Sequence, residues 1–393
     1  MTPISSFIGN KQVIIDRYIR SEIEKDLDKA MVFIGGPRQV GKTFLSKQLM
    51  ASAKNPLYFN YDSIEHRKAI REHRWTADND LLIFDELHKM PKWKSWIKGV
   101  YDVEGDQHKI IVTGSARLDV YRRGGDSLLG RYHYWRLHPF TIDEIARHDL
   151  SPQDTIERLL TIGGFPQPFL SMDSREANRW RRERIERVLT EDLRGLEMVR
   201  DIASLQVLVD LLRERVGSTL AASNLARDLE VSPKTVSRWL ELLEKMYLCF
   251  VIYPYAAKNL SRSLTKPPKV YFYDNGDVTG DLGSKLENLV ATTLLKRLHW
   301  TEDYAGKRAQ LFYLRDKDHR ECDFLTVIDR KPDLCIEVKV DDDQVSKNLR
   351  YYAARIKARR AVQIVLKLKT PYESDGVLVT DPYSFFTKQE LLA

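Results

Sequence analysis

Cysteine is scarce in this chain of 393 residues, which has only three: Cys249, Cys322 and Cys335. They form no CxxC pair, and three cysteines cannot supply the disulfide framework of a small secreted protein. The cysteine content therefore predicts a protein of a reducing compartment, and we expect a cytoplasmic location.

Long apolar runs are also missing. No stretch approaches the ~18 consecutive apolar residues of a membrane-spanning helix. The first twelve residues lack the charged and apolar regions of a signal peptide. Glycine (19) and proline (15) are too few for a collagen-like or low-complexity chain. With 43% apolar residues, a chain of this length predicts a soluble protein of about two or three domains without a membrane partner.

Charge is nearly balanced, with 63 Lys and Arg against 56 Asp and Glu, a formal net charge of +7. This excess permits a nucleic-acid partner but does not establish one.

The sharpest motif lies between the apolar run 31–34 and an amphipathic helical pattern that begins near residue 44. A strand, a glycine loop and a helix start form the setting of a P-loop, in which backbone N–H groups surround a phosphate. Lys42 reaches the β and γ phosphates in such a loop, and the Thr43 hydroxyl takes a Mg²⁺ position. The predicted nucleotide-binding residues are Gly36, Pro37, Arg38, Gln39, Val40, Gly41, Lys42 and Thr43.

A second apolar run, residues 81–84, ends in two adjacent carboxylates. This pattern is typical of a buried parallel strand that opens onto a site. We expect Asp85 to hold Mg²⁺ and Glu86 to polarise the attacking water. An apolar run followed by Asp-Glu is common, so the interpretation depends on the P-loop upstream.

Two further residues near the predicted nucleotide site each have two possible roles. Ser115 follows the apolar run 110–112 and either senses the γ-phosphate or belongs to a plain turn. Arg131 precedes the strand expected over 132–137 and is either an arginine finger on a neighbouring subunit's nucleotide, which implies a homo-oligomer, or a solvated surface residue.

Five segments together resemble a family of bacterial and archaeal AAA-type P-loop ATPases. They are PRQVGKT, LLIFDELHKMPKW, TGSA, LLGRYHYWRLHPF and GGFP. In that family the ATPase is fused to a C-terminal region of unknown function. The resemblance runs from about Val32 to beyond Lys339. The resemblance implies that the first part of the chain has a RecA-like parallel sheet and uses ATP and Mg²⁺.

The middle of the chain reads as helical. The basic run 178–184 favours a solvated helix face, with a phosphate-backbone contact as the alternative. A short helix over 223–229, a tight turn, and a helix with Ser232 as N-cap and Pro233 at its first position predict a helix-turn-helix. Lys234, Ser237 and Arg238 face outward in this interpretation. Strands over 249–253 and 270–273 complete a winged helix, which serves in DNA contact or in protein packing.

The C-terminal part predicts a helix over 284–298 and strands over 310–314, 321–325 and 334–339. A helix over 345–358 and a strand over 361–366 follow. Glu337 and Lys339 share one face of their strand because side chains alternate. Asp323 on the preceding strand and Glu287 on the helix can join them. Carboxylates chelate Mg²⁺, and an ammonium orients or deprotonates the bound water.

This set resembles the restriction-endonuclease-like (PD-(D/E)xK) nucleases, with Cys322-Asp323 in place of the usual Pro-Asp. The resemblance implies a site with catalytic Asp323, Glu337 and Lys339, and with Mg²⁺ or Mn²⁺ held by Glu287, Asp323 and Glu337. The alternative is a set of strand-end salt bridges on a scaffold without catalysis.

The chain as a whole predicts an α/β protein of four parts. These are a RecA/AAA-like P-loop domain (1–145), a helical lid or linker (146–210), a winged helix-turn-helix (211–275) and a restriction-endonuclease-like domain (276–393). We expect an ATP-hydrolysing, Mg²⁺-dependent protein that processes nucleic acid, DNA rather than RNA. Two alternatives stay open: a regulatory ATPase switch whose C-terminal domain binds without cutting, and a DNA-binding regulator whose specificity lies in helix 233–246.

Overall fold

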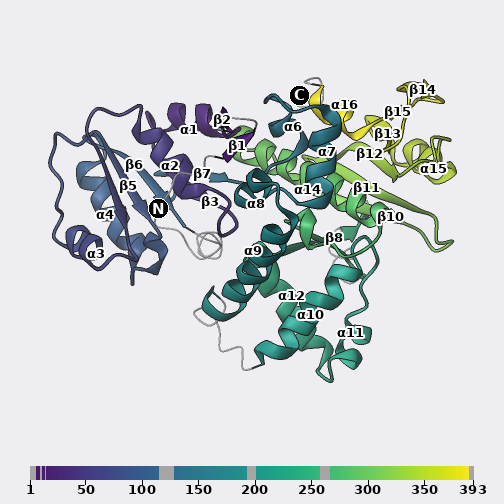
Figure 1. Ribbon diagram of the computed structural model, residues 1–393, viewed down its shortest axis with the longest axis horizontal. Coiled ribbons are helices and arrows are strands. Elements are labelled where there is room, and N and C mark those ends of the chain that lie inside the picture. Colours follow the sequence, from purple (N-terminus) through teal and green to yellow (C-terminus); the bar gives the residue numbers. More distant parts are fainter. Residues whose placement is uncertain are drawn as a thin grey trace. The chain divides into compact units, whose positions relative to one another are not determined.

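The computed structural model describes residues 6–8, 11–13, 15–114, 128–192, 201–256 and 266–388, with the backbone alone at 6–8, 11–13 and 192. The chain forms two compact units, residues 1–139 with 245–247, and residues 140–244 with 248–393. Figure 1 gives the element labels used below.

A parallel five-stranded sheet forms the centre of the first unit. Its strand order is β4-β5-β6-β3-β7, and its neighbouring strands pair in parallel. The strands are β3 (Met31–Gly35), β4 (Pro56–Asn60), β5 (Leu81–Asp85), β6 (Lys109–Thr113) and β7 (Tyr132–Arg136). All five positions of β3 and of β5 are buried, which confirms the predicted parallel sheet with apolar strands. A short antiparallel pair, β1 (Ser6–Ile8) with β2 (Lys11–Val13), precedes it.

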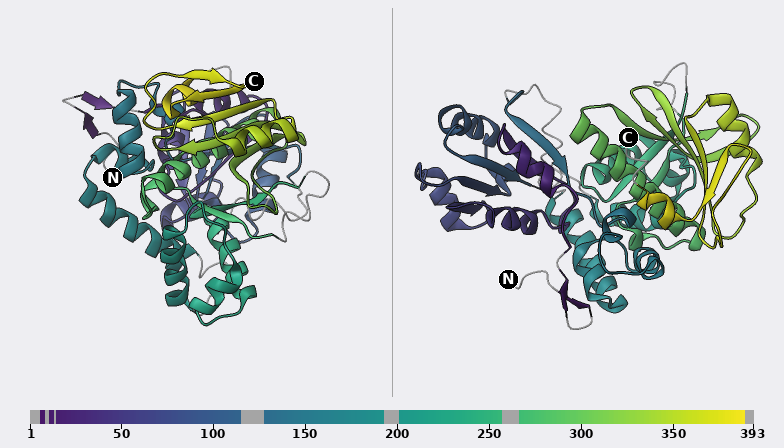
Figure 2. Two further views of the ribbon diagram at one scale, coloured as in Figure 1. Left: turned by 90° about the vertical axis from the view of Figure 1, so that its right-hand side faces the viewer. Right: turned by 90° about the horizontal axis from the view of Figure 1, so that it is seen from above.

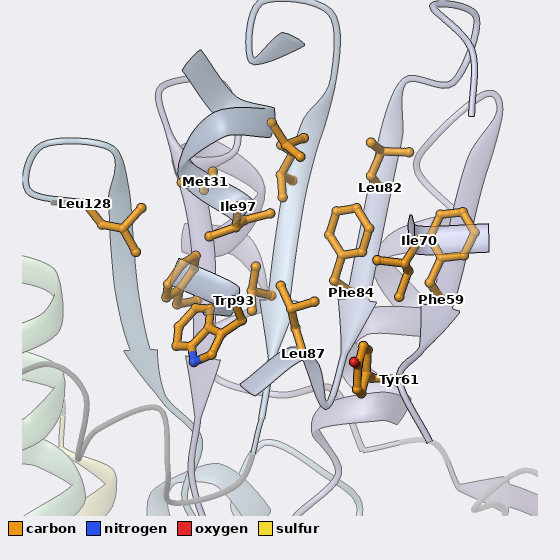
Figure 3. Close-up of a cluster of buried hydrophobic side chains, with 14 of the residues drawn as sticks. Met31, Phe59, Tyr61, Ile70, Leu82, Phe84, Leu87, Trp93, Ile97 and Leu128 are labelled. Atoms are coloured by element: carbon orange, nitrogen blue, oxygen red, sulfur yellow. The ribbon is translucent and has the colours of Figure 1, made fainter. Parts of the chain in front are cut away.

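Helices pack on this sheet around one apolar core. They are α1 (Arg20–Asp26), α2 (Lys42–Met50), α3 (Ile64–Arg71) and α4 (Trp93–Glu104), with a 3₁₀ turn η1 (Leu87–Lys89) after β5. Phe84 of β5 and Trp93 and Ile97 of α4 belong to the buried cluster in Figure 3. This core fixes β5, and therefore the carboxylates at its end, against α4.

The second unit begins with helices. They are α6 (Ile142–Ile145), α7 (Pro152–Thr161), α8 (Pro166–Ser171), α9 (Ser174–Arg187), the π-turn η2 (Val188–Asp192), α10 (Ile202–Glu214), α11 (Ala222–Asp228) and α12 (Pro233–Lys245). Ser232 caps α12, because the Thr235 amide donates to its Oγ at 3.1 Å. Pro233 is the first helical residue, as predicted.

An eight-stranded mixed sheet, green to yellow in Figure 2, follows these helices. Its order is β14-β15-β13-β12-β11-β10-β8-β9. The elements are β8 (Cys249–Pro254), β9 (Lys269–Phe272), the 3₁₀ turn η3 (Asn275–Asp277), α14 (Leu282–Ala305), β10 (Ala309–Arg315), β11 (Glu321–Ile328), β12 (Lys331–Lys339), α15 (Lys347–Ile356), β13 (Arg360–Val365), β14 (Tyr372–Ser374), β15 (Val377–Thr380) and α16 (Pro382–Thr387). The predicted order of helix, three strands, helix and strand is confirmed by α14 to β13.

The strands predicted as a wing have a different setting. β8 and β9 pair antiparallel, but β8 also pairs in parallel with β10. The two strands are therefore the edge of the large sheet, which crosses the predicted boundary between residues 275 and 276. Residues 257–262, between the two strands of the predicted wing, lie outside the described residues.

A buried ion cluster joins α9 to η3. Arg184 pairs with Asp277, and Arg181 lies 3.4 Å from Asp274 and 3.6 Å from Asp277. A side chain at Gly163 would collide with the Asp274 carboxylate, because a Cβ there has no room. Two arginines of the basic run 178–184, Arg181 and Arg184, are therefore buried rather than solvated, because carboxylates at and just before η3 pair with them in the interior.

Within the described ranges, the helices lack the combination of length and apolar side chains that a membrane span requires.

Candidate functional site

The loop between β3 and α2 has the backbone of a phosphate-binding loop. Gly36, Gln39 and Gly41 have φ of 140°, 65° and 102°, a region that favours glycine. A side chain at Gly36 would collide with the carbonyl oxygen of Leu137. The loop leads into the N-terminus of α2, where free N–H groups favour an anion.

Arg17 anchors this loop from outside the motif. Its guanidinium donates to the Val40 carbonyl at 2.7 Å and also to the His138 carbonyl. Arg17 is buried, so these charge-assisted bonds hold the loop against the segment after β7.

Lys42, the first residue of α2, is buried, and its ammonium lies inside the loop. Nζ donates to the carbonyl oxygens of Gly36 at 2.9 Å and Pro37 at 2.7 Å. The cation is therefore held where a phosphate would bind.

Asp85 is the centre of a hydroxyl cluster at the end of β5. Thr43 Oγ1 donates to its Oδ2 at 2.8 Å, and Tyr58 OH donates to the same oxygen at 2.5 Å. Thr113 at the end of β6 donates to Oδ1. Burial and the Asp85 carboxylate raise the pKa of Tyr58 well above its ordinary value, so Tyr58 remains a donor.

Glu86 follows directly in a left-handed conformation, with φ of 56°. Lys89 Nζ lies 3.3 Å from Glu86 Oε2 and 2.7 Å from Asp62 Oδ2. Burial raises the pKa of Glu86 against the opposing charges of Lys42 and Lys89. A strained backbone and a shifted carboxylate at a loop are typical of a catalytic position.

The residues around the loop suit ATP with Mg²⁺. Thr43 and Asp85 offer a hydroxyl and a carboxylate oxygen 2.8 Å apart, and hard oxygen donors are what Mg²⁺ prefers. The loop amides and Lys42 suit the phosphates. The predicted residues of the motif and of the Asp-Glu pair are thus brought together at one end of the sheet.

The two remaining predictions for this half have different outcomes. Ser115 lies outside the described residues. Arg131 pairs with Asp102 at 2.6 Å. Because β7 runs parallel to β3, with Met31 opposite Tyr132, Arg131 lies at the sheet edge away from the loop of its own chain. A role on nucleotide would therefore have to be in a second copy.

The second predicted cluster lies where α14, β11 and β12 meet. Asp323 Oδ2 accepts from the Val338 amide at 2.8 Å, and Lys339 Nζ is 2.9 Å from Glu337 Oε1. Glu287 on α14 accepts from Tyr271 OH at 2.7 Å. Burial and the Asp323 charge raise the pKa of both Glu287 and Glu337 to about 7, and burial raises the pKa of Asp323. Burial thus shifts all three carboxylates in the same direction.

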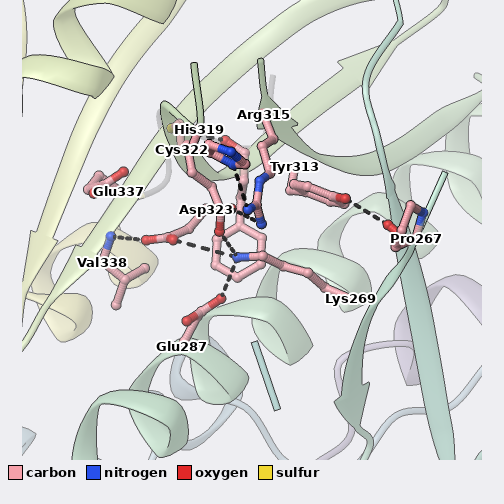
Figure 4. A network of polar contacts seen from close by, with 12 residues as sticks. Pro267, Lys269, Glu287, Tyr313, Arg315, His319, Cys322, Asp323, Glu337 and Val338 are labelled. Atoms are coloured by element: carbon pink, nitrogen blue, oxygen red, sulfur yellow. Dashed lines mark hydrogen bonds and ion pairs between the residues drawn. The ribbon is translucent and has the colours of Figure 1, made fainter. Parts of the chain in front are cut away.

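Lys269, the first residue of β9, enters this cluster. Its Nζ lies 2.6 Å from Glu321 Oε1, 3.4 Å from Glu287 Oε1 and 3.9 Å from Asp323 Oδ1. Figure 4 shows the Lys269 ammonium pointing at Glu287 and Asp323. No dashed line connects Glu337 with Lys269, Glu287 or Asp323 in this view. The residue is 2% exposed, so the ammonium is an interior charge.

These residues do not fit the predicted metal. Among the described residues, no group of three or more His, Cys, Asp or Glu side chains is placed to hold a metal ion. Glu287, Asp323 and Glu337, the ligands that the sequence predicts for Mg²⁺ or Mn²⁺, do not make up such a group in the described part of the chain. The physical reason is Lys269, whose positive charge already lies among the carboxylates.

The helices α11 and α12 present a polar surface. Val236, Trp239 and Leu243 of α12 are buried. Lys234, Ser237 and Arg238 are exposed on the same helix, as the sequence predicted.

Three site residues escaped the sequence analysis. Thr113 had a usable signal, since it is a hydroxyl at the end of an apolar strand, beside the Ser115 that was considered. Tyr58 had none, because an aromatic residue within a strand usually indicates core. Lys269 follows Pro267-Pro268 and directly precedes the second strand of the predicted wing, so no signal in the sequence placed it in a site.

The chain was compared with known protein families. Residues 28–146 match a family described as AAA domain. Residues 153–279 and 282–381 match two families described as Domain of unknown function (DUF8612) and Domain of unknown function (DUF4143). With the loop geometry, the first match identifies residues 28–146 as an AAA-type P-loop ATPase domain.

Similar curated proteins occur in bacteria and archaea. An uncharacterized protein of Mycobacterium tuberculosis is 25% identical over 63% of this chain and 54% of its own length. A Mycobacterium bovis protein matches equally, so the chain spans about half the length of these mycobacterial relatives. An uncharacterized protein of Methanocaldococcus jannaschii is 24% identical over 95% of this chain and 86% of that protein.

Solved structures show distant likeness. The Walker-type ATPase of Pyrococcus abyssi is 16% identical, covers 68% of this chain and 95% of its own, and has a TM-score of 0.42. A RuvB structure of Thermotoga maritima is 16% identical over 59% of this chain and 88% of that one, with a TM-score of 0.29.

Proposed function

We propose that this AAA-type ATPase uses ATP binding and hydrolysis to control how its second unit binds nucleic acid, DNA rather than RNA. The observation that carries the proposal is the surface of α12, where Lys234, Ser237 and Arg238 are exposed close to a capped N-terminus. A helix of this kind suits a groove, and basic side chains suit phosphates. The net charge of +7 supports the same partner.

The P-loop side of the proposal assigns a role to each residue of the loop. Bound ATP would provide the γ-phosphoryl group, and Mg²⁺ would neutralise the negative charge of the phosphates. Thr43 and Asp85 would hold the metal ion, and Lys42 would turn from the Gly36 and Pro37 carbonyls to the phosphates.

Glu86 orients the attacking water and accepts its proton. The side chain is mostly buried, and Lys89 restrains its carboxylate at 3.3 Å. A partly desolvated carboxylate with a raised pKa is a stronger base than an exposed one. Arg131 acts on the nucleotide of a second copy in this scheme, so the active form is a homo-oligomer.

The sequence left open whether the C-terminal domain cuts nucleic acid. Cleavage by Asp323, Glu337 and Lys339 requires a metal ion, and Lys269 lies among the carboxylates instead. The arrangement supports the alternative of a regulatory switch whose C-terminal domain binds without cutting.

An ATPase assay with nucleotide-binding measurements tests the role of the loop. Lys42→Ala should abolish ATP binding or turnover. Glu86→Gln should bind ATP but lose about 10²–10⁴-fold in turnover, the usual contribution of a general base. Glu65→Gln, an exposed glutamate on α3, is the matched control and should hydrolyse normally. Normal turnover by Glu86→Gln would show that the base is misassigned.

A binding titration against duplex DNA, single-stranded DNA and RNA at several salt concentrations tests the partner. Affinity should fall steeply with salt. Lys234→Ala and Arg238→Ala should each lower the slope of log K against log salt by about 1, because each removes one cation that faces a phosphate. Lys369→Ala removes an exposed charge far along the sequence and should leave the slope unchanged. Glu86→Gln with ATP should bind with a different affinity from the nucleotide-free protein. A flat salt response would remove nucleic acid as the partner.

A further inference from the structure

We propose that Lys269 is a built-in cation that takes the place of a divalent metal ion among Glu287, Glu321 and Asp323, so that the C-terminal domain neither binds a metal ion there nor cuts a phosphodiester. This inference rests on the proposed function, in which that domain binds without cutting, and it explains how a nuclease-like set of carboxylates becomes a metal-free site.

The first support is the position of the ammonium. Nζ lies within 4 Å of one oxygen from each of Glu287, Glu321 and Asp323. These three carboxylates come from α14 and from β11. The ammonium therefore already lies between the carboxylates of the helix and of the strand, and its charge would repel a metal ion that approached the same oxygens.

The second support is that the carboxylate oxygens already have donors. Glu287 Oε1 accepts from Tyr271 OH at 2.7 Å as well as from Lys269. Asp323 Oδ2 accepts from the Val338 amide at 2.8 Å, and Oδ1 faces Lys269. A metal ion would have to break several of these contacts before it could bind.

The third support is that Lys269 is fixed in place. Its backbone pairs with β8 and its side chain is 2% exposed. The ammonium also lies 5.5 Å from the centre of the Tyr313 ring, within the range of a cation–π contact. The strand pairing, the burial and the ring contact together hold the ammonium among the three carboxylates.

One carboxylate oxygen in the cluster still lacks a partner. Glu337 Oε2 is buried and accepts no hydrogen bond in the described part of the chain, although Oε1 pairs with Lys339. Removing the lysine charge would also leave the carboxylates of Glu287 and Asp323 without the cation that now faces them. Lys269→Met, which keeps the length and loses the charge, should therefore uncover a metal site among Glu287, Glu321 and Asp323.

The experiment titrates Mn²⁺ into the full chain without nucleotide or nucleic acid, by calorimetry and by the shift in Tm. Wild type and Asp323→Asn should give the same result, because no bound ion depends on Asp323 in the wild type. Lys269→Met should gain a site with an affinity at least about a hundredfold higher than wild type, the direction set by removing a like charge. Lys269→Met with Asp323→Asn should lose that site again.

Lys347→Met is the matched control, since Lys347 is exposed at the start of α15. It should titrate like wild type. A wild-type Mn²⁺ site that disappears in Asp323→Asn would overturn the proposal, and so would a folded Lys269→Met that gains no site. If Lys269→Met does not fold, the wild-type and Asp323→Asn pair decides alone, and equal titrations support the proposal.

Cleavage assays complete the test. Wild type incubated with Mg²⁺ or Mn²⁺ and DNA or RNA should show no cleavage that Asp323→Asn removes, and cleavage of that kind would overturn the proposal. The titration contains neither ATP nor nucleic acid, so a result that contradicts the role of Lys269 would not contradict the proposed ATPase switch. A flat salt response would likewise contradict nucleic-acid binding but not the role of Lys269.

Discussion

Replacing Asp277 by asparagine removes the negative charge that faces Arg184 in the interior of the second unit. Both side chains are almost fully buried, with 2% of Arg184 and none of Asp277 exposed. Within the described part of the chain, Arg184 forms an ion pair with Asp277 alone, and its guanidinium otherwise lies 4.5 Å from the centre of the Phe165 ring. Asparagine keeps the shape and leaves a guanidinium without a counter-charge.

The expected cost is about 3–5 kcal/mol in the free energy of unfolding, the usual penalty for removing one partner of a buried ion pair. This is a large part of the ~5–15 kcal/mol that stabilises a domain. Arg184→Met should cost a similar amount, because Asp277 would lose its close ion pair and retain the longer one with Arg181 at 3.6 Å. The double variant should cost much less than the sum, since replacing both charges removes the unpaired ion.

Urea unfolding of the four proteins gives the coupling energy of this cycle, with the slope of the free energy against denaturant checked for constancy. Hydrogen-exchange mass spectrometry of peptides from α9 and η3 localises the loss to this contact. Asp210→Asn breaks a surface pair in which the aspartate is 63% exposed and should cost no more than about 1 kcal/mol. If the two single costs add within about 0.5 kcal/mol, the two charges are independent and the reasoning fails.

Three further predictions concern other sites. Tyr58→Phe removes one hydroxyl donor from Asp85 and should lower the ATPase rate by roughly 10-fold to 100-fold, as loss of a supporting contact at a metal site does; an unchanged rate would contradict its role. If Arg131 acts on a second copy, the ATPase rate per subunit should rise with protein concentration, whereas a constant rate would indicate a monomer. Burial alone would raise the pKa of Asp143, but Lys296 and neighbouring groups hold the pKa below its ordinary value. The ionised carboxylate therefore stabilises the fold above about pH 4. This stabilisation is lost as the pH falls through the lowered pKa. Asp143→Asn should therefore lower the Tm at pH 7, and the difference from wild type should shrink in acid; a pH-independent difference would contradict the ion pair.

The P-loop domain was predictable because its signals are local. Gly36, Gly41, Lys42 and Thr43 are neighbours in sequence, and their loop needs only the strand before it and the helix after it. The apolar run before Asp85 predicts a parallel strand by itself, and parallel strands bring their carboxyl ends to one edge. The cap at Ser232 is equally local.

The features that the sequence did not reveal all depend on long-range packing. Nothing near residue 249 indicates that β8 pairs with β10, and this pairing places Lys269 in the sheet rather than in a wing. The basic run of α9 resembles a solvated helix until Asp274 and Asp277, about ninety residues later, meet Arg181 and Arg184. The pattern of charges along a helix shows which residues share a face, but it does not show which distant side chains will pair with them.

The contrast between the two carboxylate sites shows why residue types alone are insufficient to assign a metal. Asp85 receives donors from three neutral hydroxyl groups, on Thr43, Tyr58 and Thr113, and such donors orient a carboxylate without cancelling its charge. Asp323 faces an ammonium, which cancels charge as well as orienting it. A dication gains far more from a carboxylate that is oriented and still negative than from one that is already neutralised. Under our proposal, the identity of the donor, which only the fold reveals, suits the first site to Mg²⁺ and leaves the second without a metal ion.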